Sequence, residues 1–419
     1  MPQEQPVAAL VIVLKDELES AIVSINRLQP DTLCFVLPAT LKPAVEQDLQ
    51  PRIHKMPRRW DWVALADPDN FPACHHTLAR SLPPMLATWA VEPGALVADL
   101  TGATPSVAAA LALTALPYTS RIIVIADPAE GRQGDPLSIG TRERLWMQAN
   151  PWDEAAESVR REAGDLFNRG AFVAAASLFR RIEQHVSGGQ KPLSRAFVDL
   201  AEGYDLWERF QYRQAWEKLK TSAKAMEMAS LFGGPPGLTA TVSHVKANAS
   251  FLEKLVLDPA DVKEGLLLDL LAHAGRRLQR NHDAEGAMIV LARALEATAQ
   301  RQLFKTHKIK TWDVRPEQLP QALQELCRTC LLDDIDGKFK LPLQVQFRIL
   351  AALGDPLGQA FLREWPSMKT LLDAGHHAVL GHGFEPIKAE RVQQLYDVAL
   401  RLSGVSEGSL PRFPTLGVS

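Results

Sequence analysis

Apolar and polar residues follow two different patterns along this chain, and the change falls near residue 150. Before it, short apolar runs rich in β-branched residues, which predict buried strands, alternate with longer stretches of helical periodicity. Strands are therefore expected at 7–14, 33–37, 62–65, 95–99 and 121–126, and helices at 17–28, 75–91 and 106–116. Pro83 and Pro84 are expected to kink or split the second of these helices. The alternation predicts an α/β fold in which a parallel sheet carries helices on both faces.

From Asn150 onward the strand signals vanish and long amphipathic helices follow one another. Three stretches, at 163–179, 204–219 and 274–291, share one plan: an apolar helix, a short polar break, and a second helix that contains small alanines. The plan resembles tetratricopeptide hairpins, in which alanine lets two helices approach closely, but its spacing is irregular. Further helices are expected at 265–280, 284–303, 318–331, 343–353 and 389–402. The second part of the chain is therefore predicted to be all-α.

The composition is that of a chain with several domains and a mixed surface. A length of 419 residues predicts two or three domains, and an apolar content of 46% is ample for their cores. The formal net charge is -3, so any nucleic-acid site must be a local patch. No signal peptide and no membrane-spanning segment are expected, and the four cysteines form no disulfide framework, which predicts a cytoplasmic protein. The closest cysteine pair, Cys327 and Cys330, is expected to be two small apolar residues on one helix face.

The segment from Val97 to Val107 is the most distinctive motif of the first part. It is expected to form a strand that stops at Asp99, a tight turn of small residues, and the start of a helix. Such a turn places free backbone N–H groups and hydroxyls beyond the carboxyl end of a strand, where they suit phosphate and ribose groups. The candidate ligand-binding residues are Asp99, Thr101, Gly102, Ala103, Thr104 and Ser106, together with Lys15 and Asp16 after the first strand. The alternative is a strand–turn–helix junction that binds nothing.

This segment resembles the ligand motif of CARF domains, the Rossmann-like sensors of cyclic oligoadenylate in type III CRISPR defence. The family pattern is Asp-x-Thr-Gly-Gly-Thr-Lys-x-Met, and Pro105 and Val107 stand here in place of its lysine and methionine. The resemblance implies a homodimer that binds a cyclic oligoadenylate across its two CARF domains. It also implies three domains: a CARF-like domain at 1–150, a helical linker domain at 151–262 and a HEPN-like effector domain at 263–419.

The segment from 371 to 387 contains three of the eleven histidines of the chain, His376, His377 and His382. It resembles the motif of HEPN ribonucleases, Arg-Asn-x-Ser-x-Leu-x-His-Gly in the CARF–HEPN family. Alignment on His382 and Gly383 places the family arginine at Gly375. The resemblance implies metal-independent cleavage of single-stranded RNA, in which histidine transfers protons and arginine stabilises the charge of the phosphorane. With glycine at 375, an imidazolium of His376 or His377 is expected to replace the arginine.

Several alternatives stay open at this point. His382 is a structural residue in one of them, and His376, His377 and His382 bind zinc in another, although no metal or other cofactor is expected. The whole chain is either a cyclic oligoadenylate-activated ribonuclease, or an inactive sensor or scaffold, or a protein whose CARF domain degrades its ligand with the help of Thr104 or Ser106. A basic stretch, 301–315, interleaved with aromatic residues, is either an RNA track or a solvated linker.

Overall fold

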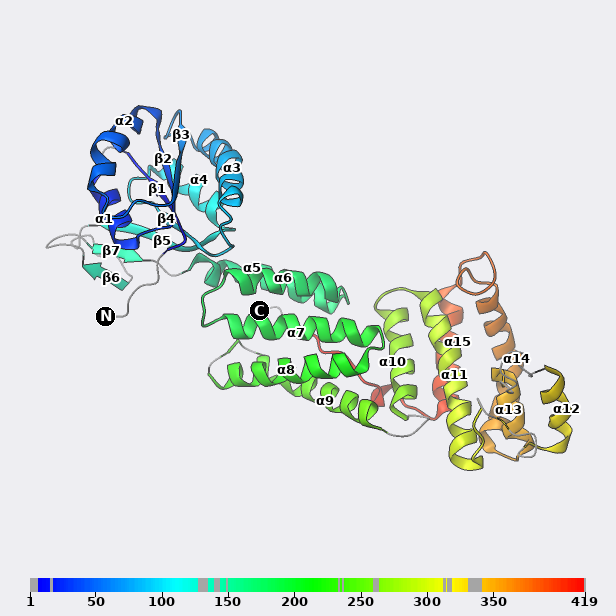
Figure 1. Cartoon of the computed structure of the whole chain (residues 1–419). Helices are drawn as coiled ribbons and strands as arrows, with labels where there is room; N and C mark the ends of the chain where they lie inside the picture. The colour runs from blue at the N-terminus through cyan, green and yellow to red at the C-terminus, as the bar shows by residue number, and fades with distance from the viewer. Residues whose placement is uncertain are drawn as a thin grey trace. The chain divides into compact units, whose positions relative to one another are not determined.

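The N-terminal part is built on one sheet with a parallel centre. In this computed structural model, the described residues are 7–15, 18–126, 135–138, 144–147, 150–232, 234–235, 237–258, 264–311, 314, 319–330 and 341–417. The strand order is β3-β2-β1-β4-β5-β7-β6 (Figure 1). The parallel strands are β1 (Ala9–Val13), β2 (Thr32–Pro38), β3 (Arg59–Leu65), β4 (Leu96–Asp99) and β5 (Thr119–Ala126). Two antiparallel strands, β7 (Arg144–Met147) and β6 (Asp135–Ser138), extend the β5 edge and were not expected from the sequence.

Helices cover both faces of this sheet because its central strands are apolar on both faces. Leu10 and Ile12 of β1 pack in one cluster with residues of α1 (Glu19–Leu28). Val11 and Val13, whose side chains point the opposite way, pack with residues of α3 (Phe71–Thr88) and α4 (Pro105–Ala115). Figure 1 shows α1 and α2 (Lys42–Ala44) on one side and α3 and α4 on the other. The predicted α/β fold of this part is confirmed.

The helix α3 corrects one expectation. It runs without a break through Pro83 and Pro84, so neither proline splits it. Leu78, Leu82 and Leu86 are fully buried on one face of the helix, on both sides of the proline pair. Burial of this continuous apolar stripe offsets the loss of the backbone hydrogen bonds that the prolines cannot donate.

After residue 150, the secondary structure of the described residues is helical, as predicted. Its helices are α5 (Pro151–Asn168), α6 (Phe172–His185), α7 (Lys191–Glu208), α8 (Tyr212–Leu231), α9 (Leu238–Leu257), α10 (Glu264–Gln279), α11 (Ala284–His307), α12 (Gln321–Cys330), α13 (Leu343–Ala352), α14 (Pro356–His376) and α15 (Ala389–Ser403). By its contacts the chain divides into one unit of residues 1–163 and 176–198 and a second of 164–175 and 199–419. The domain boundaries expected at 150 and 262 stay a prediction. None of the described helices is both long and apolar enough to cross a membrane.

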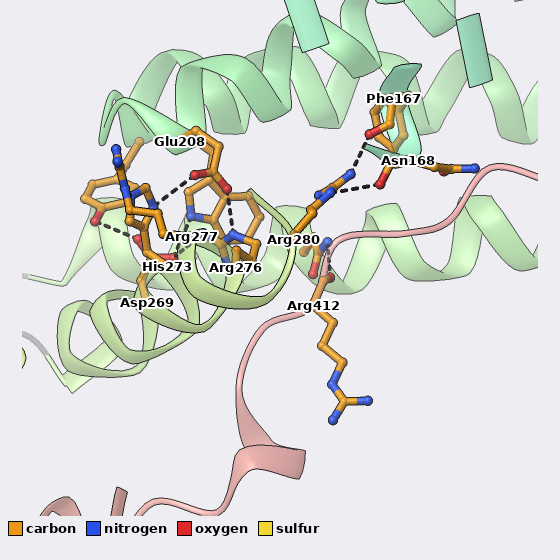
Figure 2. A network of polar contacts seen from close by, with 12 residues as sticks. Phe167, Asn168, Glu208, Asp269, His273, Arg276, Arg277, Arg280 and Arg412 are labelled. Atoms are coloured by element: carbon orange, nitrogen blue, oxygen red, sulfur yellow. Dashed lines mark hydrogen bonds and ion pairs between the residues drawn. The ribbon is translucent and has the colours of Figure 1, made fainter. Parts of the chain in front are cut away.

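Within the second unit, a buried polar network joins α10 to the end of α7 and the start of α8 (Figure 2). The Asp269 carboxylate has no exposed surface and accepts hydrogen bonds from Trp207 Nε1 and Tyr212 Oη, each at 2.8 Å. Arg276 donates from Nε to Glu208 at 2.6 Å, and its Nη2 lies 3.6 Å from Asp269. Burial raises the pKa of Asp269, and the guanidinium of Arg276 opposes that shift. The network fixes α10 to α7 and α8.

Residues 411–416 return to the helices of the second unit and form what we call the C-terminal strap. Asn168 pairs with the backbone of Leu416 through two hydrogen bonds, at 2.8 and 3.0 Å. The Phe413 ring packs against Tyr204 and Trp207, with centroids 4.5 and 5.0 Å apart. The Arg276 guanidinium lies 4.0 Å from the centroid of the same ring, so the strap and the polar network share a residue.

Candidate functional site

The turn after β4 lies at a point in the sheet where the chain connections diverge. β1 and β4 are adjacent and parallel, with Ile12 paired to Asp99, so both strands end at the same edge. From β1 the chain passes to β2 on one side, and from β4 it passes to β5 on the other. In open α/β sheets, ligands bind in the crevice outside such a point. The predicted ligand residues therefore lie where this fold class binds its ligands.

Asp99, the last residue of β4, stabilises the turn through hydrogen bonds to its buried carboxylate. Its buried carboxylate accepts hydrogen bonds from the Ser24 hydroxyl at 2.5 Å and from the Thr101 N–H at 2.9 Å and hydroxyl at 2.5 Å. Burial raises the pKa of this carboxyl group, and these hydrogen bonds counteract the shift. The Thr101 hydroxyl oxygen also accepts from the Ile125 N–H at 2.9 Å. These contacts make Asp99 and Thr101 supports of the turn rather than groups that face a ligand.

Gly102 brings the turn directly against the end of β1. A Cβ at this position would lie 2.5 Å from the Val13 carbonyl oxygen and 3.3 Å from the Lys15 nitrogen. Only glycine allows that approach, because a real Cβ does not come so close to backbone. The approach places the exposed Lys15 beside the turn, as predicted, whereas Asp16 lies outside the described residues.

The hydroxyls at the start of α4 are not free, which corrects the expectation from the sequence. Thr104 donates from its hydroxyl to the Pro68 carbonyl at 2.6 Å and caps the helix by accepting from the Val107 N–H. Ser106 donates to the Asp69 carbonyl at 2.8 Å. In the part of the chain that the structure describes, the backbone N–H groups of Gly102, Thr104 and Ser106 have no hydrogen-bond partner, whereas that of Ala103 donates to Leu100. Backbone N–H groups, not hydroxyl protons, are thus what this turn offers to an anion.

The histidine-rich turn connects α14 to α15 and is held by backbone contacts. The Glu285 carboxylate of α11 accepts from the Leu380 N–H at 3.1 Å and from the Ile387 N–H at 3.0 Å. The His382 N–H donates to the His376 carbonyl at 2.8 Å. His376, His377 and His382 are all exposed at the side chain, and no described residue hydrogen-bonds to the His382 ring.

Gly375 faces the helix core, not the histidines. A Cβ at this position would lie 2.9 Å from Met288 Cγ and closer still to its Cε, and Met288 is buried on α11. An arginine placed at 375 would therefore begin in contact with α11. The motif position of the arginine is thus packed against α11, where glycine fits and a larger side chain does not.

An open groove of about 680 Å³ runs beside this turn. Its walls come from the end of α14, from the turn and from the start of α15. His377 is the predicted histidine that lines it, and Lys388 and Arg391 are the cations. Sequence reasoning missed Lys388 and Arg391. The signal present was a pair of basic residues three positions apart, at the start of the helix that follows the histidines.

Two other predicted features have structural roles where they are described. In the basic stretch, Arg301 and Lys305 pair with Glu264 at 2.7 and 3.1 Å, and the His307 ring lies 3.1 Å from Asp355. Trp312 and Arg315 of that stretch lie outside the described residues, as does the Cys330 side chain, whereas Cys327 is buried. Among the described residues, no three His, Cys, Asp or Glu side chains are grouped to hold a metal ion.

Comparisons with known proteins bear on the helical part first. Residues 155–252 match the family model of the Csm6 6H domain, and residues 261–406 match that of the Csm6 HEPN domain. The two models describe domains of one protein and together cover more than half of the chain. The chain belongs to the CARF–HEPN family of type III CRISPR-associated proteins.

A solved structure extends the likeness to the whole chain. Enterococcus italicus Csm6 bound to cyclic hexa-2'-fluoro-hexa-dAMP aligns with a TM-score of 0.59 at 12% identity, over 96% of each chain. At this identity the alignment shows a common fold, which includes the N-terminal α/β part that neither family model covers. No curated protein sequence matches the chain.

Proposed function

We propose that this protein is a cyclic oligoadenylate sensor that cleaves single-stranded RNA when its ligand is bound. The observation that carries the proposal is the exposed histidine turn beside an open groove whose lining includes Lys388 and Arg391, within residues that match a Csm6 HEPN domain. The proposed division of the chain is a CARF-like domain at 1–150, a helical domain at 151–262 and a HEPN-like domain at 263–419. The proposed location is the cytoplasm.

The ligand of the sensor is proposed to bind at the turn between β4 and α4. Three unpartnered N–H groups at a helix start favour a phosphate, and the exposed Lys15 adds a positive charge beside them. The solved relative was captured with a cyclic hexanucleotide analogue, which supports a ring of linked nucleotides as the ligand class. Pro105 in place of the family lysine predicts weaker and less salt-sensitive binding, because one phosphate-facing cation is missing.

A homodimer is part of the proposal. A symmetric ring ligand presents the same groups twice, which a twofold pair of crevices can bind. On the HEPN side, Val379, Leu380 and Phe384 of the histidine turn are exposed by 56%, 57% and 96%. Apolar side chains in such positions favour burial against a second copy of the chain.

The proposed reaction is attack of the ribose 2′-hydroxyl on the adjacent phosphorus. His382 transfers the proton, and the bond to the 5′-oxygen breaks to leave a cyclic phosphate and a free hydroxyl. The five-coordinate phosphorus carries extra negative charge, which a nearby cation must stabilise. Single-stranded RNA suits an exposed turn beside an open groove.

Two alternatives have specific observations in their favour or against them. The packing of Gly375 against Met288 favours an inactive sensor or scaffold, because the motif arginine has no place there. Degradation of the ligand by Thr104 or Ser106 is disfavoured, because both hydroxyls donate to protein carbonyls.

Cleavage of labelled single-stranded RNA in EDTA, with cyclic oligoadenylate present, tests the proposal. The wild-type protein should cleave, and His382→Ala should lower the rate roughly a hundredfold or more through loss of proton transfer. His54→Ala, at an exposed histidine of the N-terminal part, serves as the matched control and should retain the rate. Equal rates for wild type and His382→Ala would remove His382 from the reaction, and no cleavage by the wild type would favour the scaffold.

A further inference from the structure

The HEPN groove lacks the motif arginine, so in the proposed function another residue must supply the positive charge that the reaction needs. Position 375 cannot supply it, because its Cβ direction leads into Met288. Among the histidines of the turn, only His377 lines the groove. An imidazolium loses its charge close to neutral pH and is an unreliable cation there.

We propose that Arg391, in the first turn of α15, binds the scissile phosphate of the RNA and stabilises its negative charge. Arg391 lines the groove together with Lys388, the N-cap residue of the same helix. The inference rests on the proposed ribonuclease function and deepens it by naming a phosphate-binding residue.

The side chain of Arg391 is exposed and unengaged. It forms no ion pair or hydrogen bond with any residue in the described part of the chain. Two other arginines of the domain are engaged: Arg277 pairs with Asp283 at 2.5 Å, and Arg401, on the same helix as Arg391, pairs with Glu364 at 3.5 Å. A guanidinium left free at the wall of a groove is available to a ligand.

The other charged groups of the groove set the field that Arg391 experiences. His377 and Asp373 come from α14, and Glu385 and Lys388 from the turn. The two carboxylates balance the charges of Lys388 and Arg391, so the groove as a whole does not attract every anion. Arg391 is not ion-paired to either carboxylate, and a phosphate that enters replaces water, not an existing salt bridge.

Arginine suits this role better than a histidine for two physical reasons. Its planar guanidinium can donate two parallel hydrogen bonds to phosphate oxygens, which orients the phosphate as well as attracts it. It also stays charged throughout the physiological pH range.

The test uses the full-length protein with its activating ligand and compares Arg391→Gln, Arg391→Lys and Arg363→Gln. Arg363 is an exposed arginine of α14 that does not line the groove, so its variant is the matched control. Arg391→Gln should lower kcat by roughly a hundredfold, with a smaller loss for Arg391→Lys and none for the control. A wild-type kcat in Arg391→Gln would overturn the proposal.

A binding measurement separates this inference from the proposed function. Fluorescence anisotropy with a labelled, uncleavable 2′-deoxy oligonucleotide reports phosphate binding without any reaction. If the wild type cleaves no RNA, the proposed function fails, and the binding arm still decides on Arg391. Affinity at least about fivefold weaker in Arg391→Gln than in Arg363→Gln supports the phosphate site, since one contact to a phosphate is lost. Equal affinity in the two variants overturns it.

Discussion

At the scale of single residues, Gly102 is the position of the proposed ligand site that leaves no room for a side chain. Its Cα faces the Val13 carbonyl so closely that any Cβ would sit 2.5 Å from that oxygen. The turn can keep its three N–H groups in place only while this approach holds. The family pattern has glycine here too, and the structure supplies the physical reason in this chain.

Gly102→Ala should therefore weaken the sensor in two ways. Relief of the clash must move the turn away from β1, which we expect to lower the free energy of unfolding by about 1–3 kcal/mol. The same movement should lower the affinity for a cyclic oligoadenylate by at least roughly tenfold, because the N–H groups lose their arrangement. Thermal unfolding and calorimetric titration measure the two effects. Gly188→Ala, at a glycine with nothing within 4 Å of the added Cβ, is the control, and equal behaviour of both variants would contradict this account.

The turn itself could be predicted from the sequence, but the hydrogen-bond partners of its hydroxyls could not. The small residues of 99–106 predicted the turn and its place at the sheet edge, because strand and helix patterns are local. The partners of the Thr104 and Ser106 hydroxyls, at Pro68 and Asp69, are more than thirty positions away. No local pattern could show that these hydroxyls were already engaged.

At the scale of elements, the junction of α10 with α7 contains a histidine that folding keeps neutral. His273 has no exposed surface, and its Nε2 accepts from Arg277 Nε at 2.7 Å. Burial lowers the pKa of His273 to about 4, although the nearby Glu208 carboxylate opposes the shift. In the unfolded chain the same ring takes up a proton near pH 6.5.

This difference predicts a pH dependence of stability with a definite sign. As pH falls from about 6.5 to about 4, His273 becomes protonated in the unfolded state but stays neutral in the folded state. The free energy of unfolding therefore decreases over this range, by up to roughly 3 kcal/mol. His273→Gln, which keeps an acceptor for Arg277, should lose less stability over this range. Urea unfolding at several pH values tests the difference, and parallel pH profiles for the two proteins would show that His273 does not contribute.

Element boundaries were predicted where the chain marks them with strong local signals. The helix at 284–303 was expected, and α11 begins at Ala284, where the Asp283 side chain caps it at Gly286. It extends to His307 and ends at Lys308, which adopts a left-handed conformation without being glycine. Because lysine is not a typical helix-ending residue, the predicted helix ended four residues before the observed one. The β6–β7 pair was missed because the sequence there lacks the alternation of a half-buried strand.

At the scale of the whole molecule, the order of an α/β part and an all-α part was predicted from the change of pattern near residue 150, and the structure confirms it. The C-terminal strap and the polar network of Figure 2 were not predicted. Asn168 and Leu416 are 248 positions apart, and contacts at such separations leave no periodicity in a single sequence.

The central claim is that a ligand at the N-terminal turn controls RNA cleavage at the histidine turn. The most direct test is the initial rate of single-stranded RNA cleavage by the full-length protein, measured in EDTA against the concentration of cyclic tri-, tetra- or hexa-adenylate. One ring size should raise the rate to a plateau, and Gly102→Ala should need at least roughly tenfold more of that ring to reach half of the plateau. A rate that stays the same with all three rings, at concentrations up to the high micromolar range, would contradict the claim.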